Sequence, residues 1–214
     1  MAEDRFETPY PTYDVLKKWD SPSYNDATRR VVAHRLNNRP ERRFFTEREF
    51  ALLRAIMDTV LPQDERDEAT RVPLEGFIDD KLYRNVTDGT RRAGIPPQRE
   101  AWREGLEAID AEAKASHRFP FIDLSPKERH EVLQRIDGGD ANRKLWKSMD
   151  GKFFFRHVLL KQAVKFYYGH PLGWNEIGFG GPAAPRGYVR LGPDMRDPWE
   201  AKEEREPQKA EKLP

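Results

Sequence analysis

Hydrophobic positions recur at helical spacing through the middle of the chain and lose that spacing at both ends. From residue 44 to residue 168, apolar side chains return every three or four residues, the period that brings them to one face of an α-helix. The alternation typical of a half-buried strand is nearly absent there. The pattern predicts an all-α fold: a bundle of about five helices with extended, irregular N- and C-terminal arms.

Two helix starts carry the capping-box pattern, in which Ser or Thr is followed three residues later by Glu. Thr46 and Glu49 open the first helix, which Pro62 ends, and Ser125 and Glu128 open the fourth. In such a box each partner satisfies a backbone N–H that the first helical turn leaves without an acceptor. Both helix starts are therefore predicted to within a residue.

The other helices are predicted from periodicity. One is expected after Pro73, one over residues 97–117, and a last one over about residues 142–168, interrupted near Gly151. The expected buried residues are Trp102, Leu106, Ile109 and Ala113 in the third helix, and Phe153, Phe154, Val158, Leu159, Val164 and Tyr167 in the last.

The two ends differ from the helical domain at 44–168 in composition. Residues 1–43 are interpreted as an N-terminal arm, partner-docking or partly disordered, with a short helix near 27–36. Residues 169–200 hold seven Gly and five Pro among aromatic and arginine side chains, which predicts a partner-binding arm in neither helix nor strand. Residues 201–214 are a charged tail expected to be disordered.

Composition narrows the function. The 214 residues include 38 basic and 37 acidic ones, and a net charge of +1 gives no global attraction to nucleic acid or anionic lipid. The absence of cysteine excludes disulfides, thiolate metal sites and a cysteine nucleophile. The chain shows no membrane span and no secretory signal, so as written it is expected to be cytoplasmic, without direct membrane insertion.

The chemistry-bearing residues form no catalytic, cofactor-binding or metal-binding pattern. No two of the five histidines lie three or four residues apart, and the glycines at 178–181 have neither dinucleotide-binding nor P-loop spacing. The neighbouring Asp79 and Asp80 are interpreted as part of a solvated face or a turn. The six arginines within 29–43 favour a solvated or partner-docking role over nucleic-acid binding.

The aromatic and basic residues of the C-terminal arm are the strongest indication of function. Trp, Tyr and Arg are the side chains most enriched at protein–protein hot spots. The alternative is an irregular cap folded over the chain's own bundle, and both interpretations can hold in part. The expected partner-binding residues are His170, Pro171, Trp174, Asn175, Glu176, Phe179, Arg186, Tyr188, Arg190 and Trp199.

Several stretches resemble the gluconate 2-dehydrogenase subunit 3 family. HPLGWNEIGFGGPAAPRGYVRL, followed by DPWEA, is similar to the family's C-terminal signature, and FFTEREFALLRAIMDTVLPQD is similar to its first helix. VPLEGFIDDKLY, FIDLSPKERHEVLQRID and FFFRHVLLKQAVKFYYGHP extend the resemblance, which covers roughly residues 44–200 in order.

The resemblance implies a non-catalytic small (gamma) subunit of a flavin-dependent sugar, glycoside or polyol dehydrogenase. Its partner would be a GMC-type catalytic subunit that carries FAD, and some complexes of the family add a cytochrome c. In an alternative, the small subunit also shapes the active-site entrance through His170, Trp174, Asn175 and Glu176. Many family members begin with a twin-arginine signal that this chain lacks; export with a partner would place it in the periplasm.

Overall fold

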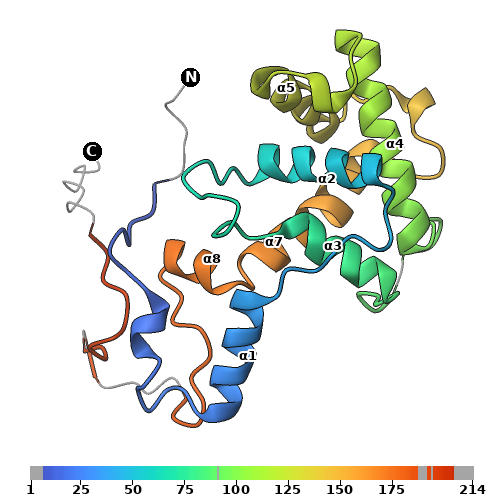
Figure 1. Ribbon diagram of the computed structural model, residues 1–214. Helices are drawn as coiled ribbons and strands as arrows, with labels where there is room; N and C mark the ends of the chain where they lie inside the picture. Colours follow the sequence, from blue (N-terminus) through green and yellow to red (C-terminus); the bar gives the residue numbers. More distant parts are fainter. Residues whose placement is uncertain (1–6, 91, 188–191, 194, 205–214) are drawn as a thin grey trace. The chain divides into compact units, whose positions relative to one another are not determined.

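The computed structural model describes residues 7–90, 92–187, 192–193 and 195–204 (Figure 1). Every regular element in these ranges is helical, apart from an isolated parallel β-bridge between Tyr24 and Ala184. The predicted all-α fold class is confirmed for this part of the chain. The elements in order are η1 (Val15–Lys18), α1 (Asp26–Asn37), α2 (Glu47–Val60), α3 (Leu74–Tyr83), α4 (Gln98–His117), η2 (Phe121–Asp123), α5 (Pro126–Gly138), η3 (Arg143–Leu145), α6 (Gly151–Phe153), η4 (Phe154–Leu160), α7 (Lys161–Tyr167) and α8 (Pro171–Glu176).

The chain folds into two compact units. The first, which we call the middle unit, runs from Arg39 to Phe166. The second, the terminal unit, combines the two ends of the chain, up to Asn38 and from Tyr167 onward. The two end segments therefore belong to one folded unit, although the hydrophobic pattern treats them as separate arms.

Local capping signals set the helix boundaries of the middle unit. In both predicted capping boxes the backbone N–H of the cap residue donates to the glutamate at 2.8 Å, from Thr46 to Glu49 and from Ser125 to Glu128. The return bonds to the Thr and Ser hydroxyls are also present. α5 ends at Gly138, and the following Gly139 caps it with a φ of +97°, a conformation that favours glycine.

The core of the middle unit lies where α2, α4, α5 and η4 pack on one another. Trp102 and Phe154 meet edge to face with 5.7 Å between ring centroids. Gly105 makes room for this packing, because a Cβ atom there would lie 2.2 Å from the Phe154 ring. The main buried side chains of these elements are Leu53, Ile56, Met57, Trp102, Leu106, Ile109, Val132, Leu133, Ile136, Phe154 and Leu159.

The last long helix differs from its prediction in two ways. It begins at Gly151 with the Asp150 side chain as its N-cap, so the break precedes Gly151. Phe154–Leu160 is π-helical, and its hydrogen bonds span one residue more than those of an α-helix. The wider turns shift the register that α-helical periodicity assumes. Ala163 consequently faces the core, whereas Val164, which was predicted to be buried, is 45% exposed.

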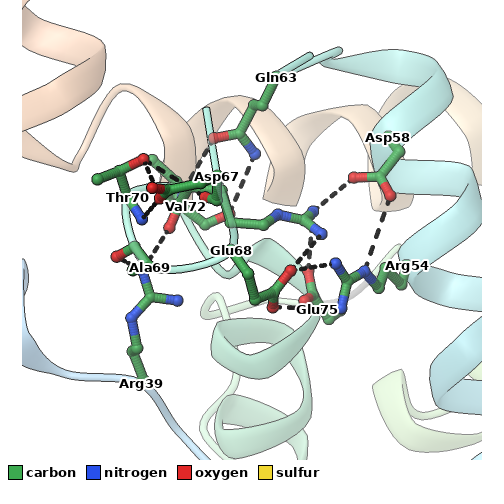
Figure 2. A network of polar contacts seen from close by, with 11 residues as sticks. Arg39, Arg54, Asp58, Gln63, Asp67, Glu68, Ala69, Thr70, Val72 and Glu75 are labelled. Carbon is green, nitrogen blue, oxygen red and sulfur yellow. Dashed lines mark hydrogen bonds and ion pairs between the residues drawn. The ribbon is translucent and has the colours of Figure 1, made fainter. Parts of the chain in front are cut away.

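A polar network holds the connection between α2 and α3 (Figure 2). The Gln63 amide pairs with the backbone of Val72, donating to its oxygen at 3.1 Å and accepting from its N–H at 2.8 Å. The buried Arg71 guanidinium forms ion pairs with Asp58 and Glu75. Burial raises the pKa of Glu75, and Arg71 acts in the opposite direction. Charged residues thus order a connection that has no regular secondary structure of its own.

Candidate partner-binding site

The C-terminal segment contains one short helix, α8, that the sequence did not predict. The His170 side chain caps it, with Nδ1 accepting a hydrogen bond from the Leu172 N–H at 3.3 Å. Pro171 occupies the first turn, where its missing N–H is not needed for a helical hydrogen bond. The prediction that residues 169–200 form neither helix nor strand is therefore wrong for Pro171–Glu176.

Trp174 of α8 belongs to the hydrophobic core of the terminal unit. It is buried in a cluster with Val15, Tyr24 and Val32, which come from the N-terminal segment. Its indole Nε1 donates to the backbone oxygen of Tyr168 at 2.8 Å. α8 packs against both η1 and α1, so the blue and orange elements lie together in Figure 1. Trp174 is consequently a core residue of its own chain, with little surface left for a partner.

The polar residues beside Trp174 also bind the N-terminal segment. The Asn175 side-chain oxygen accepts from the Val15 N–H at 2.8 Å. The Glu176 carboxylate accepts from the Tyr167 hydroxyl at 2.6 Å, and its backbone oxygen accepts from the Thr8 hydroxyl at 2.7 Å. The contacts of Asn175 with Val15 and of Glu176 with Thr8 connect the two ends of the chain, through residues that were predicted to bind a partner.

A buried lysine fixes the irregular stretch after α8. The Lys18 ammonium donates to the Pro182 backbone oxygen at 3.0 Å and lies 4.8 Å from the centre of the Tyr24 ring. Burial lowers the pKa of Lys18, and Glu200 acts in the opposite direction. The Asn25 N–H donates to the Ala184 oxygen at 2.8 Å. Lys18 and Asn25 thus hold the stretch from Pro182 to Ala184 through its backbone oxygens.

The turn after α8 presents two apolar side chains to solvent. Ile177 is 43% exposed and Phe179 is 42% exposed. Between them Gly178 has a φ of +63°, and a Cβ atom there would lie 2.7 Å from the Tyr10 ring. The Phe179 ring meets Trp174 edge to face at 5.8 Å, and its N–H donates to the Trp174 oxygen at 2.9 Å. Two apolar side chains fixed on a folded support suit a protein contact.

The remaining predicted residues have different environments. Arg186 forms an ion pair with Asp197 at 2.6 Å, and its guanidinium lies 5.3 Å from the Trp199 ring centre. Tyr188 and Arg190 lie outside the described residues. Among the described members of the predicted set, Phe179 is the apolar side chain that remains exposed.

Ile177 is the part of this surface that sequence reasoning missed. It lies one residue beyond α8, where helical periodicity no longer says which side a residue faces. The signal in the sequence is the Ile-Gly-Phe triplet, because glycine readily adopts the positive φ of a tight turn, and Gly178 does so here. We take Ile177–Phe179 as the candidate contact site and call it the apolar turn.

The described residues contain no group of three or more His, Cys, Asp or Glu side chains arranged to hold a metal ion. Within the same residues, none of the helices combines the length and the apolar character that crossing a membrane requires.

Fold and site together define a helical protein whose two ends form one unit and expose an apolar turn. The family model described as gluconate 2-dehydrogenase subunit 3 matches residues 47–181, more than half of the chain. The chain therefore belongs to this family, whose description names one subunit of a dehydrogenase. The match begins at α2 and includes the apolar turn, but it does not extend over residues 182–200 of the resemblance. The comparisons with curated proteins and with solved structures found no match.

Proposed function

We propose that the protein is the non-catalytic small subunit of a flavin-dependent dehydrogenase that oxidises a sugar, a glycoside or a polyol. In this proposal a separate GMC-type chain carries FAD and the catalytic residues, and this chain binds it. The observation that carries the proposal is the family match over residues 47–181. The apolar turn inside that match supplies a contact surface, and a cytochrome c subunit is a further partner that the resemblance implies.

The small subunit acts by mass action. A protein that binds the folded, FAD-loaded catalytic chain and not its unfolded form stabilises it by about 2.7 kcal/mol at a hundred times the dissociation constant. A stable interface buries roughly 800 Å² on each partner, which is more than two side chains can supply. Ile177 and Phe179 are therefore proposed as the anchor of a larger contact, in the way that a few central residues dominate most interfaces.

The two alternative functions gain no specific support. His170 and Trp174 are buried, and Asn175 and Glu176 bind other residues of the terminal unit, so these side chains are poorly placed to line a partner's active site. In the basic segment at 29–43, Arg35 donates to the Gly169 oxygen at 3.0 Å. Neither an active-site role nor nucleic-acid binding is proposed.

Co-expression tests the stabilising role. The partner to test would be the product of a neighbouring reading frame, if that frame encodes a dinucleotide-binding fingerprint. We expect this partner to accumulate as soluble, flavin-containing protein when the small subunit is present, and to lose flavin or solubility when it is absent. Flavin absorbance per mole of purified catalytic chain measures the effect. Equal yield and equal flavin content without the small subunit would show that the stabilising role is wrong.

A further inference from the structure

A concave surface lies in the middle unit. It is a hollow of about 400 Å³ whose lining contains three guanidinium groups and one carboxylate. The guanidinium of Arg43 lies 4.4 Å from the Tyr83 ring centre, and that of Arg103 lies 4.6 Å from the Phe44 ring centre. The lining residues are Arg43, Phe44, Tyr83, Arg99, Glu100 and Arg103.

A buried carboxylate sets the backbone on one side of the hollow. Asp79 is fully buried and accepts hydrogen bonds from three successive backbone N–H groups, those of residues 43, 44 and 45, at 2.6, 3.0 and 2.9 Å. Asp80 is also buried and forms ion pairs with Arg43 and Arg84. The expectation that Asp79 and Asp80 lie on a solvated face or in a turn is therefore wrong, because both are buried within α3. Residues that are close to them only in the folded chain supply the hydrogen-bond donors, which offset the cost of burying the two carboxylates.

Backbone oxygens hold the other two arginines. Arg99 donates from Nε to the Leu82 oxygen at 2.7 Å and from Nη2 to the Tyr83 oxygen at 2.6 Å, which satisfies carbonyls at the end of α3. Arg103 donates to the Phe44 oxygen at 3.3 Å. A carbonyl oxygen orients a guanidinium without neutralising its charge. The lining is consequently preorganised, with three guanidinium groups and one carboxylate.

Acidic groups pair with Arg43 and Arg103, whereas Arg99 is held by the backbone oxygens of Leu82 and Tyr83. Glu49 lies 3.7 Å from Arg103, while its other oxygen accepts from the Thr46 N–H in the capping box. Asp80 is shared between two arginines, and Glu100 is the one carboxylate of the lining. Guanidinium groups stacked on aromatic rings present their edges for two parallel hydrogen bonds to a carboxylate.

We infer that this hollow binds an acidic segment of a protein partner, with an Asp or Glu carboxylate on the arginines and an adjacent apolar group on the rings. The side chains of Arg43 and Arg103 remain 44% and 53% exposed. Sites for small molecules enclose most of their ligand, whereas walls this exposed suit a surface segment of another protein. The inference rests on the proposed function only in assigning that segment to the catalytic subunit.

A titration of the isolated full chain tests the hollow directly. The probe is the blocked peptide Ac-Asp-Glu-Asp-Glu-Asp-Glu-NH₂. Its binding is monitored at low salt through the backbone amide chemical shifts of the protein. We expect saturable shifts at Phe44 and Tyr83. The double variant Arg43→Gln/Arg103→Gln should bind about tenfold more weakly, since it removes two charge-assisted contacts. The matched control is Arg48→Gln, which removes an exposed arginine that is paired with Asp110 and lies outside the lining.

Absence of shifts at Phe44 and Tyr83, or unchanged peptide affinity in the double variant, would overturn the inference. Binding of citrate as tightly as the peptide would also overturn it, because it would indicate a small-anion site. If the double variant unfolds, the single variant Arg103→Gln takes its place, because its lost contacts are long and exposed. The titration needs no flavoprotein. A positive titration with a failed co-expression test would thus separate the hollow from the proposed function, and the reverse result would remove the hollow alone.

Discussion

Each of the two units of this protein is stabilised by its own internal contacts, and these contacts differ in how far apart the partners lie in the sequence. In the middle unit, helix ends are set by partners three residues apart, such as Thr46 with Glu49. In the terminal unit the decisive contacts join residues that are 160 or more positions apart, such as Val15 with Asn175 and Lys18 with Pro182. A signal of the first kind can be read from a short window of sequence, whereas one of the second kind cannot.

The comparison also separates two roles within the C-terminal motif. Trp174 and Asn175 hold the terminal unit together, while Ile177 and Phe179 stay exposed on it. A motif rich in aromatic residues can thus combine buried core residues with exposed apolar side chains over six positions. The predictions below test this division, beginning with the largest expected effect.

Removing the Trp174 side chain should unfold the terminal unit selectively. Trp174→Ala deletes a large side chain from a small core, and such changes typically cost about 3–5 kcal/mol. Hydrogen exchange should show fast exchange in α1 and α8, with protection retained in α2, α4 and α5. The matched variant Trp102→Ala, which removes a fully buried tryptophan of the middle unit, should give the opposite pattern. Loss of protection across both units in either variant would contradict their independence.

Two glycines at positive φ should differ in the cost of an added methyl group. Gly139→Ala should cost about 1 kcal/mol from backbone strain, because a Cβ atom there would meet its nearest neighbour at 3.8 Å. Gly178→Ala should add a steric clash with the Tyr10 ring to the same backbone strain, so its total cost in unfolding free energy should be about 1–3 kcal/mol. Chemical denaturation of the two variants measures both costs, and equal values would argue against the packing of Tyr10 on the apolar turn.

Asp88 should make the stability of the middle unit depend on pH. Burial would raise the pKa of Asp88, but hydrogen bonds from Lys81 and Lys165 outweigh it and lower that pKa from 3.8 to about 2. A carboxyl with a depressed folded pKa stabilises the fold above its unfolded value, so the stabilisation is present above pH 3.8 and is lost as the pH falls toward 2. We expect Asp88→Asn to cost about 1 kcal/mol at neutral pH. Urea unfolding should show this difference from wild type shrinking below pH 4, and a constant difference would refute the assignment.

What could be predicted from the sequence follows the same division. The capping boxes at Thr46 and Ser125 were predicted correctly because both partners lie within one helical turn. The exposure of Val164 could not be predicted, since it depends on a π-helical segment that three-and-four periodicity does not reveal. The burial of Asp79 was equally hidden, because its donors lie more than 30 positions earlier in the chain.

The candidate site was predicted only in part. The motif around Trp174 was correctly singled out as unusual, but composition alone cannot tell an aromatic residue that anchors a partner from one that anchors its own chain. That distinction depends on Val15, Tyr24 and Val32, which lie about 140 or more positions away in the sequence. Whether the exposed part of the motif binds a partner stays a prediction.

The central claim is that the apolar turn anchors the catalytic subunit. Copurification of the flavin-containing chain with the double variant Ile177→Ser/Phe179→Ser tests it most directly, with Val164→Ser as a control of similar exposure in the middle unit. Loss of hot-spot side chains typically costs at least 2 kcal/mol, so we predict binding weakened by about 30-fold or more in the double variant. The control should bind as wild type does. Unchanged copurification of the double variant, with α8 still protected from hydrogen exchange, would contradict the account.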